Sequence, residues 1–113
     1  MLPPKHRLQK QKDFDTVYKR GRTLNGPLFN LRFLARDGDS RFGFVIGSKL
    51  EKKATRRNLV KRRFRAVVGE LLPNIKSGFD VVILIRAKAL SVPYSVLKEE
   101  VGGMFKKARM TNF

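Results

Sequence analysis

Positive charge is concentrated in one short segment of this chain of 113 residues. Between Lys52 and Arg65, eight of fourteen residues are Lys or Arg, and the next acid is Glu70. Ammonium and guanidinium groups bind phosphate oxygens through charge and through charge-assisted hydrogen bonds. The segment therefore predicts a partner that is rich in phosphate.

The composition of the whole chain supports this prediction. Lys and Arg number 26 against 9 Asp and Glu, which gives a net charge of +17 and a pI near 11.2. Such a balance is typical of proteins that bind nucleic acid. No apolar run approaches the roughly 20 residues that cross a bilayer, and the first residues contain no signal-peptide core. We therefore expect a cytoplasmic protein with no membrane partner.

The residues that usually carry catalysis are scarce. His6 is the only His, Cys is absent, and the nine acids form no convincing cluster along the sequence. Hydrolytic metal sites need several converging ligands, and acid–base catalysis needs paired titratable groups. We therefore predict that the polypeptide contributes no catalytic residue and holds no metal by itself.

The basic segment must be positioned by a helix. Its apolar residues recur at i, i+4, i+7 and i+11, which places them on one core-facing stripe that ends near Pro73. These residues are Val60, Phe64, Val67 and Leu71. Cations lie beside this stripe on successive turns of the helix. Like charges on successive turns repel each other and destabilise an isolated helix. An external anion is expected to neutralise them.

The rest of the chain predicts one domain, residues 1–113, with a single sheet. A basic arm of about residues 1–11 is expected to be extended, and a short helix follows that ends at Gly21. Residues 28–35 and 41–48 alternate as strands and are predicted to pair as an antiparallel hairpin. Residues 78–86 are apolar on both sides, as in an interior strand, and residues 93–110 have helical spacing. The order α-β-β-α-β-α favours helices packed on a sheet, with a parallel crossover through the basic helix.

Aromatic residues lie among the charges. Phe42 and Phe44 are predicted to fill the core, while the small Gly43 and Gly47 leave room above the opposite face of their strand. Single-stranded RNA is held by stacking of bases on aromatic rings inside basic grooves. Phe14 together with Arg32 can supply such a surface.

The segment "ATRRNLVKRRFR" resembles the Arg-Asn-Arg signature of the protein subunit of bacterial ribonuclease P. The residues that match the family pattern are Ala54, Arg57, Asn58, Val60, Lys61, Arg62 and Arg65. Leu59 departs from it, because the family usually has a basic residue there, and this is expected to cost one RNA contact. Similarity also extends to "HRLQKQKDFDTVYKRG", "RFGFVIGSK" and "GFDVVILIR", and so to nearly the whole chain.

The resemblance implies a fold and a function. The fold is an α/β (α+β) two-layer sandwich of order α-β-β-β-α-β-α, in which a left-handed β-α-β crossover carries the basic helix, against the usual right-handed preference. The function is that of the RNA-binding subunit of an endoribonuclease that removes the 5′ leader from precursor tRNA. In this family the catalyst is a large RNA with bound Mg²⁺, and the protein lowers the magnesium requirement.

The resemblance also assigns site residues and partners. Contacts to the catalytic RNA are expected from Lys53, Arg56, Arg57, Asn58, Lys61, Arg62 and Arg65. Phe14, Tyr18 and Arg32 are expected to line a cleft for the single-stranded leader. The partners are the catalytic RNA and precursor tRNA, with no protein partner required. Mg²⁺ is expected to be held mainly by the RNA and the substrate.

Two other classes of protein fit the charge and size. A ribosomal or ribosome-assembly protein binds structured RNA without assisting cleavage, and a DNA-binding module places a basic helix in a major groove. The spacing of the signature favours the ribonuclease P interpretation over both.

Overall fold

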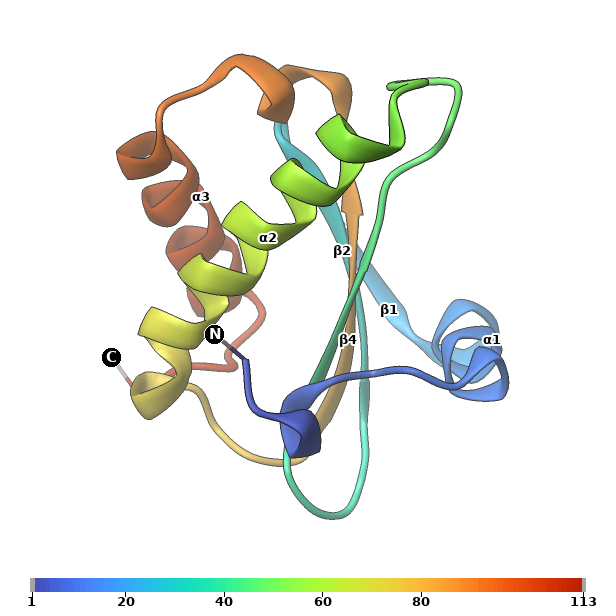
Figure 1. The fold of residues 1–113 in the computed structure, drawn as a ribbon. Helices are drawn as coiled ribbons and strands as arrows, with labels where there is room; N and C mark the ends of the chain where they lie inside the picture. The colour runs from blue at the N-terminus through green and yellow to red at the C-terminus, as the bar shows by residue number, and fades with distance from the viewer. Residues whose placement is uncertain (1, 113) are drawn as a thin grey trace.

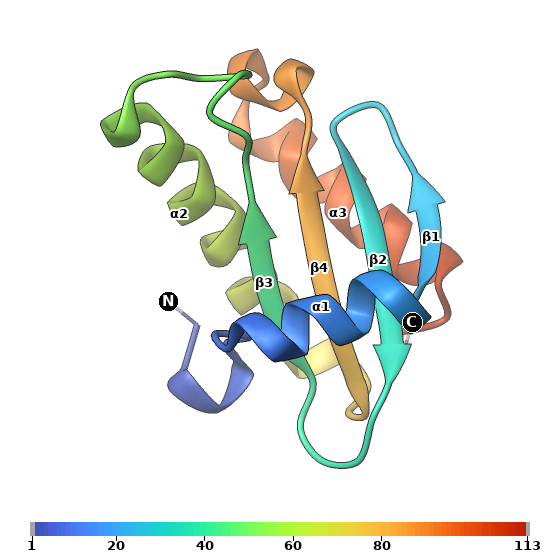
Figure 2. The same ribbon diagram turned by 90° about the vertical axis from the view of Figure 1, so that its right-hand side faces the viewer.

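The computed structural model describes residues 2–112, which form a four-stranded sheet with helices on both faces (Figure 1). The helices are α1 (Gln11–Arg20), α2 (Ala54–Leu71) and α3 (Tyr94–Lys107), with short 3₁₀ helices η1 (Pro4–His6), η2 (Leu72–Asn74) and η3 (Ala87–Ser91). The strands are β1 (Arg22–Asn25), β2 (Phe29–Ala35), β3 (Arg41–Val45) and β4 (Phe79–Ile85). In Figure 2, α1 crosses in front of the sheet, whereas α2 and α3 lie behind it. The expected mixed α/β sandwich is confirmed.

The predicted hairpin between the second and third strands is wrong. The strand order is β1-β2-β4-β3, so β4 separates β2 from β3. β4 pairs antiparallel with β2, where Val81 lies opposite Phe33, and parallel with β3, where Val81 lies opposite Phe42. A strand that is apolar on both sides is most stable in the middle of a sheet, with both edges paired and both faces covered. β4 meets this description better than either of its neighbours.

The crossover and the first strand test two further expectations. β3 and β4 are parallel neighbours joined through α2, which confirms the predicted crossover, while its left-handedness stays a prediction. The residue pattern alone did not reveal β1, because its residues are mostly exposed and the strand pairs only with β2. The resemblance implied three strands before the basic helix, and the structure has three.

Two apolar clusters lie on the two faces of the sheet. The larger fills the space below α2 and α3 and contains the α2 stripe, of which Val60, Phe64 and Val67 are buried. In this cluster Phe64 meets Phe29 edge to face, with ring centroids 5.8 Å apart. The smaller cluster lies under α1 and consists of Leu8, Val17 and Val82 with surrounding half-buried residues. Phe42 and Phe44 are 1% and 9% exposed, so their predicted core role is confirmed.

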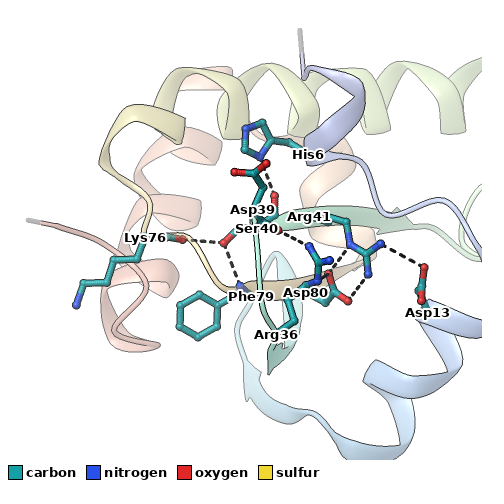
Figure 3. Close-up of polar contacts among 9 residues, drawn as sticks. All are labelled: His6, Asp13, Arg36, Asp39, Ser40, Arg41, Lys76, Phe79 and Asp80. Carbon is teal, nitrogen blue, oxygen red and sulfur yellow. Dashed lines mark hydrogen bonds and ion pairs between the residues drawn. The ribbon is translucent and has the colours of Figure 1, made fainter.

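The N-terminal arm is basic, but it is not a free extension. Leu2 and Leu8 are buried, and the N–H of Leu8 donates to the carbonyl of Phe42 at 2.9 Å. His6 Nδ1 lies 2.7 Å from the carbonyl oxygen of Ser40 (Figure 3). Docking of the arm removes the two leucines from water and gives the outer edge of β3 a hydrogen-bonding partner. Both changes are favourable. The arm therefore lies along the outer edge of β3.

Candidate RNA-binding surfaces

The residues predicted to contact catalytic RNA lie on α2 and at its N-terminus. Lys53 is the N-cap residue, and four of the seven predicted residues are exposed: Lys53, Arg56, Asn58 and Arg62. Arg57, Lys61 and Arg65 are half-buried along one flank of the helix. We call these seven residues the α2 surface.

Few acids neutralise the α2 surface. Among the ion pairs within residues 2–112, only the 3.6 Å pair of Arg56 with Glu51 involves a cation of α2. Arg57 Nη1 donates to the carbonyls of Glu51 and Lys52 at 2.8 and 2.9 Å, and so holds the loop that precedes the helix. Among residues 2–112, no acid forms an ion pair with the other cations of this surface, although Arg57 is held by these carbonyls.

Two further arginines of α2 have contacts inside the chain. The guanidinium of Arg65 lies over the ring of Phe44, 5.8 Å from its centroid, which is cation–π geometry. Arg63, which was not among the predicted site residues, donates from Nη2 to the carbonyl of Val92 at 2.8 Å. Arg63 therefore ties α2 to the segment before α3 and faces away from β3.

A pocket of about 510 Å³ joins the two predicted sets of residues. Its walls come from the N-terminal arm, α1, β3 and α2: Arg7, Leu8, Gln9, Phe14, Phe42, Gly43, Phe44, Arg62, Arg65 and Ala66. The lining therefore includes both aromatic residues and arginines. Sequence reasoning missed this pocket, because it depends on the docking of the arm beside β3. The presence of Leu2 and Leu8, two apolar residues in a basic arm, is the signal that was available.

The aromatic wall of the pocket depends on a glycine. A Cβ atom at Gly43 would lie 2.5 Å from two ring carbons of Phe14, which is closer than real atoms approach. The ring therefore occupies the room that the small residues of this strand were predicted to leave. At Gly47, in contrast, an added Cβ meets no atom within 4 Å.

Arg32 belongs to β2, and its guanidinium lies at the C-terminal end of α1, away from this pocket. Its Nη2 donates to the carbonyls of Val17, Tyr18 and Gly21, the first and last at 3.2 Å, and its Nη1 donates to Thr23 Oγ1 at 2.6 Å. The Val17 carbonyl also accepts the N–H of Gly21 at 2.8 Å, so Arg32 adds a second donor at the end of this helix. Arg32 thus anchors α1 to β2, and its predicted contact with the leader stays a prediction.

Tyr18 also lies near the C-terminal end of α1, and its side chain is 38% exposed. Partial burial raises the pKa of its phenol, and the nearby carboxylate of Asp15 raises it further, while Arg32 lowers it. The phenol is consequently a neutral hydroxyl near pH 7. It can stack on a base and donate a hydrogen bond at the same time.

Residues 2–112 lack both a metal-binding cluster and a membrane-spanning helix. They contain no group of three or more His, Cys, Asp or Glu side chains that is arranged to hold a metal ion. None of their helices combines the length and the apolar character that crossing a membrane requires.

Residues 2–109 match the family described as Ribonuclease P. The chain belongs to this family. It is 39% identical to the ribonuclease P protein component of Synechocystis sp., over 95% of this chain and 88% of that protein. It is 40% identical to the corresponding component of Microcystis aeruginosa, over 96% of this chain and 95% of that protein.

Solved structures agree with this family. The ribonuclease P protein of Thermotoga maritima superposes with a TM-score of 0.82 at 32% identity, over 89% of this chain and 96% of that one. The Staphylococcus aureus ribonuclease P protein, at 24% identity, supports the fold with a TM-score of 0.84 over 95% of this chain and 98% of that one. The ribonuclease P signature of this chain therefore lies on α2, and its departure, Leu59, is 53% exposed there.

Proposed function

We propose that this protein is the RNA-binding subunit of ribonuclease P and assists removal of the 5′ leader from precursor tRNA in the cytoplasm. Membership of the family supports the assignment to this ribonucleoprotein. In this proposal the catalytic RNA carries out the cleavage, and the polypeptide binds phosphates and bases. No further protein partner is required.

The α2 surface is proposed to bind the catalytic RNA. Its cations are clustered, mostly free of carboxylates, and carried by a helix whose opposite stripe is buried in the core. Contacts to phosphates release counterions, so the affinity is expected to fall steeply with salt. This clustering on one helix of cations that mostly have no ion pair among residues 2–112 is the observation that carries the proposal.

The pocket beside Phe14 is proposed to receive the leader. An unpaired base can stack on the ring of Phe14, while Arg62 and Arg65, which also line the pocket, can contact a phosphate of the same strand. Stacking and charge do not distinguish the bases strongly. The protein should therefore bind leaders of many sequences with similar affinity.

Mg²⁺ is proposed to be held by the catalytic RNA and the substrate. Two RNA molecules that approach each other repel through their phosphates, and magnesium normally reduces this repulsion. A polypeptide of net charge +17 placed between them reduces it as well. The reconstituted complex should therefore cleave at lower magnesium than the RNA alone.

Phe14→Ala tests the leader site in the reconstituted complex. If a base stacks on Phe14, the variant should bind precursor tRNA more weakly by about 1–3 kcal/mol and bind mature tRNA unchanged. Phe79→Ala, which removes a half-buried ring at the start of β4, controls for general destabilisation.

Equal weakening with precursor and mature tRNA would reject the leader site. If the unaltered complex bound precursor and mature tRNA equally, the protein would be a general RNA binder, as a ribosomal protein is. Preference for duplex DNA over the catalytic RNA at the same salt concentration would instead favour a DNA-binding module.

A further inference from the structure

A carboxylate is buried in the middle of the sheet, on the face that α1 covers. Asp80 is 7% exposed and belongs to β4, the central strand. Successive residues of a strand point to opposite faces, so Asp80 shares its face with Val82 and Leu84 of the smaller apolar cluster. A charged group at such a position is costly unless it is paired and hydrogen-bonded.

Arg41 supplies that pairing from the neighbouring strand. It lies directly opposite Asp80 in the register of β3 and β4. Its Nε and Nη2 donate to the two carboxylate oxygens at 2.8 and 2.7 Å, which is a bidentate arrangement (Figure 3). Arg36 Nε lies 3.6 Å from one of the same oxygens. The guanidinium of Arg41 is therefore fixed in place by the sheet.

The remaining nitrogen of Arg41 points to α1. Its Nη1 lies 3.4 Å from Oδ2 of Asp13, in the first turn of that helix (Figure 3). The next residue is Phe14, whose ring covers Gly43, two residues beyond Arg41 in β3. Two adjacent residues of α1 thus meet the same strand, one through charge and one through its ring.

We propose that Asp13 is a positioning residue for substrate binding. Through Arg41, which Asp80 holds, it fixes the first turn of α1 and with it the place of the Phe14 ring beside the pocket. Asp13 itself touches no substrate in this proposal. The inference rests on the proposed leader site, because it concerns the residue that places the ring there.

Loss of the contact between Asp13 and Arg41 should weaken leader binding only modestly, and the size of this effect has an upper limit. The side chains of Asp13 and Arg41 are 21% and 24% exposed, and one contact at 3.4 Å is weak. A contact can shift a conformational equilibrium by no more than its own free energy. Removing it should therefore weaken leader binding by about twofold to fivefold.

Asp13→Asn in the reconstituted complex is the test, with Asp15→Asn as the matched control. Both variants lose one negative charge from α1, but Asp15 is exposed, and its hydrogen bond within the chain is to Gln11 on the same helix. We expect Asp13→Asn alone to raise the Kd for precursor tRNA, with mature tRNA binding and the cleavage rate at saturating substrate unchanged. Asp13→Glu, which keeps the charge, should restore part of the affinity.

A double-mutant cycle separates positioning from general damage. When Arg41→Met and Asp80→Leu replace the buried pair, Asp13→Asn should have no further effect on leader binding, because its partner is gone. The inference is wrong if Asp13→Asn and Asp15→Asn behave alike while the unaltered complex still prefers leader-bearing substrate. It is also wrong if Asp13→Asn keeps its full effect without Arg41. Loss of leader preference in the unaltered complex would reject the proposed leader site itself.

Discussion

The outer face of α2 and the α1-covered face of the sheet both carry arginines, and the two regions use them differently. On the sheet face, Arg32 and Arg41 bind carbonyls or carboxylates of the chain itself. On α2, Arg57 and Arg63 also bind backbone carbonyls, but Lys61 and Arg62 have no acid within ion-pair distance among residues 2–112. A cation that pairs with an internal carboxylate is less available to an external anion than a cation without such a partner.

The physical cause of this difference is burial. A guanidinium next to the sheet loses water and must find acceptors within the protein. On an exposed helix, water satisfies the same group, and an arriving phosphate can replace that water. Substitutions that change one region and leave the other intact test whether the two regions differ in this way.

The largest effect is expected from Lys61→Glu combined with Arg65→Glu on α2. Two lost phosphate contacts should reduce the salt slope of catalytic-RNA binding by about two units and weaken binding about 100-fold near 0.1 M salt. Filter binding across a salt series measures both quantities. Lys106→Glu with Lys107→Glu, on α3, makes the same change of charge and should have a much smaller effect. Equal effects would show that total charge matters and its location does not.

Asp80→Ala should damage the sheet face and spare α2. It leaves Arg41 without its bidentate partner, and because Arg41 keeps some contact with water the cost should be about 2–3 kcal/mol of unfolding free energy. Urea denaturation measures this, with Asp37→Ala in an exposed turn as the control. The salt slope for catalytic RNA should be unchanged under conditions where the variant is folded, and a changed slope would contradict the division between the two regions.

Leu59→Arg adds a cation to α2 and should increase the difference between α2 and the sheet face. Leu59 is 53% exposed and neighbours the signature cations, so the new guanidinium can reach a phosphate without disturbing the core. We expect tighter binding of catalytic RNA and a salt slope steeper by about one unit or less. Val96→Arg, at an exposed site of α3, is the control and should leave the slope nearly unchanged.

Arg109→Gly should have the smallest effect and acts outside both regions. Arg109 follows α3 with φ of 60°, and the N–H of Met110 donates to Phe105 O at 3.0 Å, the arrangement of a Schellman cap. Glycine adopts this conformation without steric cost, so the variant should be more stable by about 0.5–1 kcal/mol. Thermal denaturation measures the gain. A clear loss of affinity for catalytic RNA would mean that cations outside α2 also bind it.

The sequence was sufficient for the elements that have strong periodicity. The stripe of Val60, Phe64 and Val67 predicted α2 and its buried side, and the apolar run of β4 predicted an interior strand. Alternation did not predict which strands are neighbours, because it records the two faces of a strand and carries no information about its edges. That is why β2 and β3 were paired wrongly.

The candidate site was predictable by residue type and only partly by role. The signature on α2 was predicted because its spacing is specific, and Phe14 was predicted because bases of single-stranded RNA stack on aromatic rings in basic grooves. The internal contacts of Arg32 and Arg63 were not predictable. The sequence does not distinguish an arginine that binds a backbone carbonyl from one that binds a phosphate. The pocket also required the docked arm, for which Leu2 and Leu8 were the available sequence signal.

The central place of β4 has a consequence for how the protein is made. A ribosome releases β2 and β3 before the strand that both must pair with, and Phe29 meets Ile85 only after most of the chain has been synthesised. Contacts between such distant residues form slowly, and unpaired strand edges favour aggregation. Until residues 79–85 emerge, β2 and β3 lack their shared partner in the sheet. Nascent chains should therefore become protease-resistant late in translation, in one step.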